Sequence, residues 1–164
     1  GKLISVDVDD YSNLFNDNNW TFLKTRDDDY QKVSSYFSED FDIILIDSLH
    51  EPNHVSKLIY TYWKHLKLNG SMYIDDISWL PYMKNSWRDH EYTENINRDT
   101  FNKILEIQLS NYDNINSTFS FSGSGMCRII KQNNKALNKP KLMKPRENYI
   151  KKNLKKLISL FKKA

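Results

Sequence analysis

Two apolar runs separated by a helical segment constrain the fold of this chain more than any other feature. The first run, FDIILI (41–46), leads into DSLH (47–50), and the second ends in SMYI (71–74) before the acidic pair at 75–76. Strands buried on both faces have this composition, and a helix between two such strands implies a parallel crossover. In open α/β sheets, ligands bind outside the carboxyl ends of parallel strands. We therefore expect three carboxylates and one imidazole at the functional edge of a sheet.

Weaker patterns extend this α/β prediction along the chain. Asn69-Gly70 is expected to end the helix between the two runs, because both residue types tolerate positive φ. Gly123 and Gly125 suggest a hairpin turn rather than a phosphate-binding loop, since no helix follows them. The expected strands are 2–8, 20–24, 41–46, 71–74, 118–121 and 126–130. The expected helices are 30–38, one that opens at Pro52 with the apolar face Val55, Leu58, Ile59, Tyr62 and Leu66, and one capped by Asp99 or Thr100 with the face Phe101, Ile104, Leu105, Leu109 and Tyr112.

The length of 164 residues suits one domain with a real core. A single cysteine, Cys127, excludes an internal disulfide and fits a reducing compartment. No apolar run approaches membrane-spanning length, and the N-terminus lacks the pattern of a signal peptide. We therefore expect a cytoplasmic protein.

Charge divides the chain into an acidic body, residues 1–131, and a basic tail, residues 132–164. From Lys131 onward there are twelve Lys or Arg and one acid, Glu147, so residues 1–130 carry a net charge close to −8. This charge argues against nucleic-acid backbone binding by the body. The tail has an apolar stripe with helical spacing, which fits docking on the body, an anionic membrane surface, nucleic acid or a partner. The stripe comprises Ile150, Leu154, Leu157, Ile158 and Phe161.

Three close carboxylates repel one another unless one is protonated or a cation neutralises them. Asp47, Asp75 and Asp76 would form an all-oxygen set suited to Mg²⁺ or another divalent cation. The alternative is that Asp47 caps the next helix and the pair is solvated. His50 is either a general base, since imidazole titrates near physiological pH, or a solvated loop residue.

The remaining histidines and the aromatic residues of the long loop expected at 79–97 have weaker interpretations. We expect His54, His65 and His90 to be surface residues. Four aromatic side chains of the loop suit the wall of an acceptor pocket, packing against the body or a dimer contact equally well. These are Trp79, Tyr82, Trp87 and Tyr92.

Strand-helix alternation that finishes in an antiparallel hairpin resembles the class I S-adenosylmethionine-dependent methyltransferases. This resemblance implies a Rossmann-like, mostly parallel sheet with a C-terminal antiparallel hairpin. SVDVDD resembles the family's second strand, whose terminal acid holds the cofactor ribose, here Asp7 or Asp9. WTFLKTRDDD resembles the third strand and the adenine-contacting acid after it, here Asp27 or Asp28.

FDIILIDSLH followed by Asp75-Asp76 is similar to the metal-dependent O-methyltransferases that act on sugars and catechols. The resemblance implies that Asp47, Asp75 and Asp76 bind Mg²⁺ and that His50 is the general base. The implied function is methyl transfer from S-adenosylmethionine to a hydroxyl of a sugar or another small molecule. The family's first strand and glycine-rich loop should precede Lys2. Either the chain is a fragment of the full enzyme, or the strands 2–8 and 41–46 pair directly and the cofactor site is lost. We expect the first, an N-terminally incomplete domain.

Two other functions remain open. The chain can be a non-catalytic methyltransferase-like domain that its basic tail tethers to a membrane or a polyanion. A metal-dependent phosphohydrolase using the same acids is a third option, although the sequence has no phosphate-binding loop.

Overall fold

The computed structural model describes residues 1–79 and 91–143. It contains helices and strands in an α/β arrangement, which confirms the α/β part of the predicted fold class, but the strands form two hydrogen-bonded sheets instead of one. The order of strands in the larger sheet is β3-β4-β6-β5, and β1 pairs with β2 alone. The strands are β1 (Leu3–Asp7), β2 (Trp20–Lys24), β3 (Phe41–Ile46), β4 (Leu66–Asp75), β5 (Ile115–Ser120) and β6 (Met126–Lys131). The helices are α1 (Tyr30–Ser34), α2 (Pro52–Tyr62), the short 3₁₀ segment η1 (Trp63–His65) and α3 (Glu91–Ser110).

The larger sheet is parallel on one side and antiparallel on the other. β3 and β4 run parallel, whereas β4 with β6 and β5 with β6 run antiparallel. The sheet of β1 and β2 is parallel. Two of the four strand pairs within the described residues are therefore parallel. We expected a mostly parallel sheet, and the difference arises because β1 and β3 are not bonded to each other.

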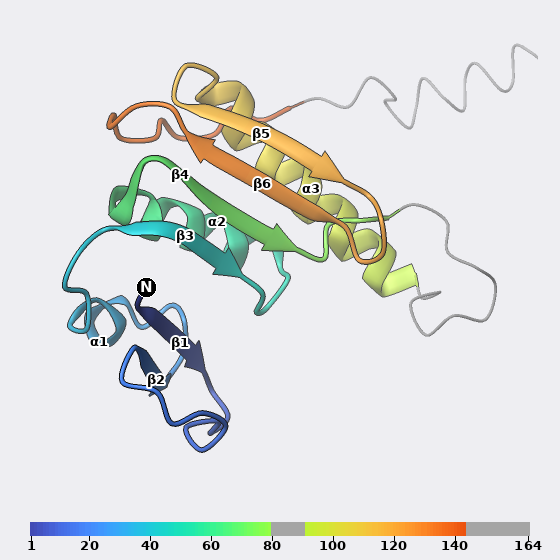
Figure 1. Cartoon of the computed structure of the whole chain (residues 1–164). Helices are drawn as coiled ribbons and strands as arrows, with labels where there is room; N and C mark the ends of the chain where they lie inside the picture. The colour runs from blue at the N-terminus through green and yellow to red at the C-terminus, as the bar shows by residue number, and fades with distance from the viewer. Residues whose placement is uncertain (80–90, 144–164) are drawn as a thin grey trace, which may run out of the picture.

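α2 and α3 cover one face of the larger sheet (Figure 1). The central strands present Met72, Ile74, Cys127 and Ile129 to these helices, and all four are almost completely buried. Ile4 and Val6 of β1 pack against the same core, so the smaller sheet is attached through side chains rather than through a backbone ladder. On the opposite face of the larger sheet, Ile43 and Leu45 are 63% and 60% exposed.

The helix between the two apolar runs ends earlier than predicted. α2 begins at Pro52 as expected, but it stops at Tyr62, and β4 already starts at Leu66 after η1. Asn69 has a φ of 64° and lies with Gly70 inside β4, not at the end of a helix. The β3–β4 register shifts between Phe41 and Ile43, so turn-forming residues accommodate an irregularity in the strand.

α3 begins earlier than predicted and buries a different face. Residues 91–97 are helical instead of belonging to a long loop. Ile104 and Ile107 are buried together with the polar Asn97 and Thr100, whereas Leu109 and Tyr112 are exposed. After β6, residues 132–143 run as coil along the helices, where the Lys135 and Asn138 carbonyls accept hydrogen bonds from Trp63 and Tyr60.

No helix in the described part of the chain has the length and apolar character needed to cross a membrane. The apolar stripe predicted between Ile150 and Phe161 lies outside the described residues, as do Tyr82, Trp87 and His90.

Candidate functional site

The parallel pairing of β3 and β4 brings the predicted site residues to one edge of the sheet. Ile46 lies opposite Ile74 in the register, so Asp47 and Asp75 follow at neighbouring strand ends. Asp76 comes next with a φ of 56°, a left-handed conformation that ends the strand sharply. Figure 1 shows the arrowheads of β1, β3 and β4 pointing toward the same side of the molecule. The predicted edge is therefore present.

His50 lies between two of the predicted acids. Its Nε2 atom is 3.3 Å from Asp76 Oδ2 and 3.8 Å from Asp47 Oδ1. The side chains of His50 and Asp76 are about a quarter exposed, whereas that of Asp47 is more than half exposed. An imidazole in this position can accept a proton from a bound hydroxyl, and the two carboxylates would stabilise the imidazolium that results.

Asp75 points to a different partner. Its Oδ1 atom accepts a hydrogen bond of 2.8 Å from the Ser124 hydroxyl, in the turn between β5 and β6. The adjacent Asp76 instead lies beside His50, so the two acids of the pair have different partners. Within residues 1–79 and 91–143, no group of three or more His, Cys, Asp or Glu side chains is arranged to hold a metal ion.

Two loops of the site are anchored to α3. The Thr100 hydroxyl donates to the His50 carbonyl at 2.7 Å, and Asn97 Nδ2 donates to the Ser78 carbonyl at 2.9 Å. Ser78 N–H in turn donates to the Ser124 carbonyl at 2.8 Å. The two anchors on α3 were not identified from the sequence, although polar residues three apart on one face of a helix are a recognisable signal.

The acids predicted to bind the cofactor lie around the ends of β1 and β2. Asp7 ends β1, and its Oδ1 accepts the backbone N–H of Asp9 at 2.9 Å. Asp27 Oδ2 is 3.0 Å from His54 Nε2. Asp28 pairs with Arg26 and Lys57, and hydrogen bonds from these two side chains hold the pKa of Asp28 well below its usual range.

Of the histidines expected at the surface, His54 is buried and His65 is partly buried, with 20% of its side chain exposed. The His54 side chain is 8% exposed because it faces Asp27 across the contact between α2 and the loop after β2. His65 Nε2 is 2.8 Å from the Tyr30 hydroxyl, and its ring packs against Phe37. The helical spacing of apolar residues after Pro52 does not reveal that the loop after β2 covers His54 or that α1 covers His65.

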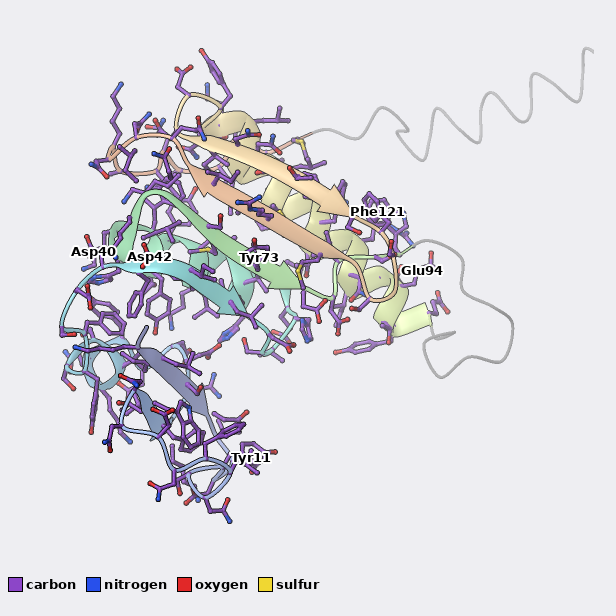
Figure 2. All side chains as sticks on the ribbon, viewed as in Figure 1. Tyr11, Asp40, Asp42, Tyr73, Glu94 and Phe121 are labelled. Carbon is purple, nitrogen blue, oxygen red and sulfur yellow. The ribbon has the colours of Figure 1, made fainter. Side chains whose placement is uncertain are left out.

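The aromatic residues near the site pack against the body. The Trp79 ring lies 4.4 Å from that of Phe101 and 5.3 Å from that of Phe121, measured between ring centroids. Figure 2 shows Phe121 at the end of the β5–β6 hairpin, beside the first turns of α3. Tyr92 is 63% exposed at the start of α3. Among the described residues, Trp79 therefore follows the packing interpretation.

Comparisons with known proteins agree with this arrangement. Residues 1–77 match the sequence family described as "Methyltransferase domain". A search of characterised protein sequences found no match. The structure is similar to that of the MycE methyltransferase from the mycinamycin biosynthetic pathway, solved with Mg, SAH and mycinamycin VI. The TM-score is 0.56 at 17% identity, over 87% of this chain and 39% of that one.

Two further solved structures share the fold. One is a putative caffeoyl-CoA O-methyltransferase from Staphylococcus aureus, with a TM-score of 0.50 at 14% identity over 70% of this chain and 52% of that one. The other is an SAH-bound methyltransferase from Podospora anserina, with a TM-score of 0.55 at 11% identity over 71% and 50%. This chain thus spans between two fifths and about half of the proteins that it resembles.

Proposed function

We propose that this chain, a class I methyltransferase by fold whose residues 1–77 match the methyltransferase-domain family, takes part in methyl transfer from S-adenosylmethionine to a hydroxyl oxygen. The acceptor is a sugar or another small molecule. The observation that carries the proposal is the placement of His50 between Asp76 and Asp47 at the carboxyl edge of the parallel strands. A group that removes a proton belongs at this edge, where ligands of such sheets bind.

The proposed reaction is an in-line displacement at the methyl carbon. The acceptor O–H bond breaks as its proton moves to His50 Nε2, and the oxygen forms a bond to the methyl carbon. The bond between that carbon and the cofactor sulfur breaks, and its electron pair leaves with the sulfur as S-adenosylhomocysteine. Asp47 and Asp76 stabilise the positive charge that His50 gains. Holding the acceptor oxygen near the methyl group supplies the other part of the rate enhancement.

For the cofactor, we propose that Asp7, with Asp9 beside it, binds the ribose hydroxyls. Asp7 is exposed at the end of β1, and its carboxylate already accepts a backbone N–H, so it is held in place. Asp27 or Asp28 would lie at the adenine. Both of these acids have partners in the structure, His54 for Asp27 and two cationic groups for Asp28. Adenine binding through Asp27 would therefore involve a side chain whose orientation His54 fixes.

We also propose a divalent cation, Mg²⁺ or a similar ion, at Asp47, Asp75 and Asp76. The donors fit such an ion chemically, because all three are carboxylates from adjacent strand ends. Two of them already converge on His50, while Asp75 is bonded to Ser124. When bound, the cation would act as a Lewis acid that lowers the cost of deprotonating the acceptor. Binding through all three acids would compete with the Ser124 hydroxyl for Asp75.

A second candidate is a non-catalytic domain that its basic tail tethers to a membrane or a polyanion. The break between the two sheets favours it, because β1, which carries Asp7, is not bonded to β3, which leads into Asp47. The acid proposed to bind the cofactor would then lie on one sheet and the residues proposed to act on the acceptor on the other, with no backbone hydrogen bonds between strands of the two sheets.

The experiment that tests the first proposal measures methyl transfer from radiolabelled S-adenosylmethionine by the full-length polypeptide. The acceptors are a catechol and a methyl glycoside, each with and without Mg²⁺. We expect His50→Gln to lower kcat by about 10²- to 10⁴-fold, because the general base is lost. Asp47→Asn and Asp75→Asn should each abolish the Mg²⁺-dependent activity while the fold is retained.

Asp42→Asn is the matched control. Asp42 is an exposed acid of β3, the strand that leads into Asp47, and it pairs with Lys67 away from the site. It should retain full activity. Unchanged turnover in His50→Gln would refute the assignment of the base, and unchanged Mg²⁺ dependence in both Asp variants would refute the metal ligands. Titration calorimetry with S-adenosylmethionine that detects no binding would favour the non-catalytic candidate.

A further inference from the structure

Two polar side chains on α3 are buried to a degree that packing alone does not explain. Thr100 is completely buried, and Asn97 is 3% exposed. They lie one turn apart and face the same direction as the apolar Ile104 and Ile107. Burying a hydroxyl or an amide destabilises a protein unless the group is hydrogen-bonded. The partners of Thr100 and Asn97 therefore indicate what this part of the helix does.

Thr100 uses its hydroxyl outside its own helix. A threonine within a helix can bond the carbonyl three or four residues earlier, which satisfies it locally. Here the Thr100 hydroxyl donates instead to the His50 carbonyl at 2.7 Å. It thereby fixes the backbone of the residue whose ring lies between Asp47 and Asp76.

Asn97 holds the other loop of the site. Its side-chain amide donates to the Ser78 carbonyl, two residues after Asp76. The Ser78 N–H is held from the opposite side by the Ser124 carbonyl. The loop that carries Asp76 is thus bound between α3 and the β5–β6 turn.

We propose that Asn97 and Thr100 are positioning residues that set the distance between His50 and Asp76. Neither touches the reacting groups; each acts through the backbone of one loop. The two loops follow different strands, β3 and β4, and the single helix α3 bonds to both. This inference rests on the proposed function, because it assigns these residues a part in the proton transfer to His50.

Steady-state kinetics of the full-length polypeptide test the role in the reaction. Thr100→Val keeps the shape of the side chain but removes the donor, and Asn97→Asp keeps the shape but removes the amide N–H groups. We expect each to lower kcat by about tenfold to a hundredfold, because small displacements of a catalytic group have effects of this size. KM for S-adenosylmethionine should be unchanged. Thr100→Ser retains the hydroxyl and should restore most of the activity.

Ile107→Val is the matched control, because it removes one buried methyl group from the same face of α3 away from the loops. It should leave kcat unchanged. Equal kcat in Thr100→Val, Ile107→Val and the unmodified enzyme would overturn the proposal, as would a fall in kcat that Thr100→Ser does not reverse.

Hydrogen exchange of the amides separates this inference from the proposed function. Thr100→Val should accelerate exchange around residues 47–50 and Asn97→Asp around residues 76–78, whereas Ile107→Val should affect neither loop. If the unmodified protein transfers no methyl group, the proposed function fails, and exchange still decides whether α3 anchors the loops. Unchanged exchange in both loops would overturn the anchoring.

Discussion

At the scale of single residues, Gly125 connects the β5–β6 turn to the loop after Asp76. Its φ is +82°, and a Cβ atom at this position would lie 2.5 Å from the Ser78 nitrogen. Gly123, in the same turn, has a φ of +60°, but a Cβ atom there would meet no other atom within 4 Å. The two glycines therefore share a backbone conformation and differ in the space around them.

Gly125→Ala should destabilise the protein more than Gly123→Ala. Both variants force a side chain into the left-handed region, which costs about 1–2 kcal/mol. Gly125→Ala also displaces the Ser78 backbone, and overpacking of this kind adds about 1–3 kcal/mol. Urea denaturation measures the difference in the free energy of unfolding. Equal losses in the two variants would show that the turn and the Ser78 loop are not in close contact.

The sequence is a good guide to some site residues and a poor one to others. His50 and the acids Asp47 and Asp76 are predicted to meet because they follow adjacent parallel strands, and the structure places them together. The pattern does not reveal that Asp75 bonds to Ser124, or that Thr100 bonds to His50. Those contacts join segments about 50 residues apart, and a local pattern carries no information on such distances.

At the scale of elements, the contact between α1 and the short 3₁₀ segment η1 contains a titratable group. His65 bonds to the Tyr30 hydroxyl and packs between aromatic rings of α1 and its neighbours. Burial lowers the pKa of His65 below its usual value, and the nearby Lys64 acts in the same direction while Asp40 opposes both.

This contact should make the protein less stable as the pH falls. The unfolded chain binds a proton to His65 at about pH 6.5, while the folded chain binds it only at a lower pH. The contribution of His65 to stability is therefore complete above that pH and decreases as the pH falls from about 6.5 toward the folded-state pKa. His65→Gln should flatten this dependence in urea denaturation at pH 7.5 and 5.5. The same slope in both proteins would contradict the prediction.

The elements also show where patterns mislead. Asn69-Gly70 has the composition of a helix end, yet the residues lie within β4, because a strand irregularity needs the same positive φ. The polar composition of residues 91–97 predicts a loop, yet these residues form the start of α3. The strands Trp20–Lys24 and Phe41–Ile46 are predicted with their observed bounds, since β-branched and aromatic runs of that length are distinctive.

At the scale of the whole molecule, the only cysteine reports on global unfolding. Cys127 lies at the centre of the larger sheet opposite Ile74, and burial raises the pKa of its thiol to about 12. The thiolate is the reactive form, so burial suppresses reaction both by excluding the reagent and by keeping the thiol protonated.

We expect Cys127 to be inert to a thiol reagent such as dithionitrobenzoate in the native protein and to react as urea unfolds it. The midpoint of reactivity should coincide with the midpoint measured by circular dichroism. As a control, the double variant Cys127→Ala/Arg128→Cys moves the thiol to the exposed face of the same strand and should react at once. Rapid native-state reaction of the unmodified chain would show that β6 opens without global unfolding.

The arrangement of the whole molecule is predictable from the sequence only in outline. The α/β class follows from two apolar strands and the helix between them. The attachment of the β1–β2 sheet does not, because it depends on side-chain contacts such as Asp27 with His54 and the Tyr62 hydroxyl with the Asp27 carbonyl.

That attachment has a consequence for the behaviour of the chain in concentrated solution. Within the described residues, β1 and β3 each pair with one neighbouring strand, so one edge of each has no strand bonded to it. Such an edge is a template for any extended peptide, and the apolar side chains of Ile43 and Leu45 stand exposed on β3. Two copies of the chain that meet at these strand edges would pair their strands into one continuous sheet. Such pairing between molecules is prevented only where another strand already bonds to the edge.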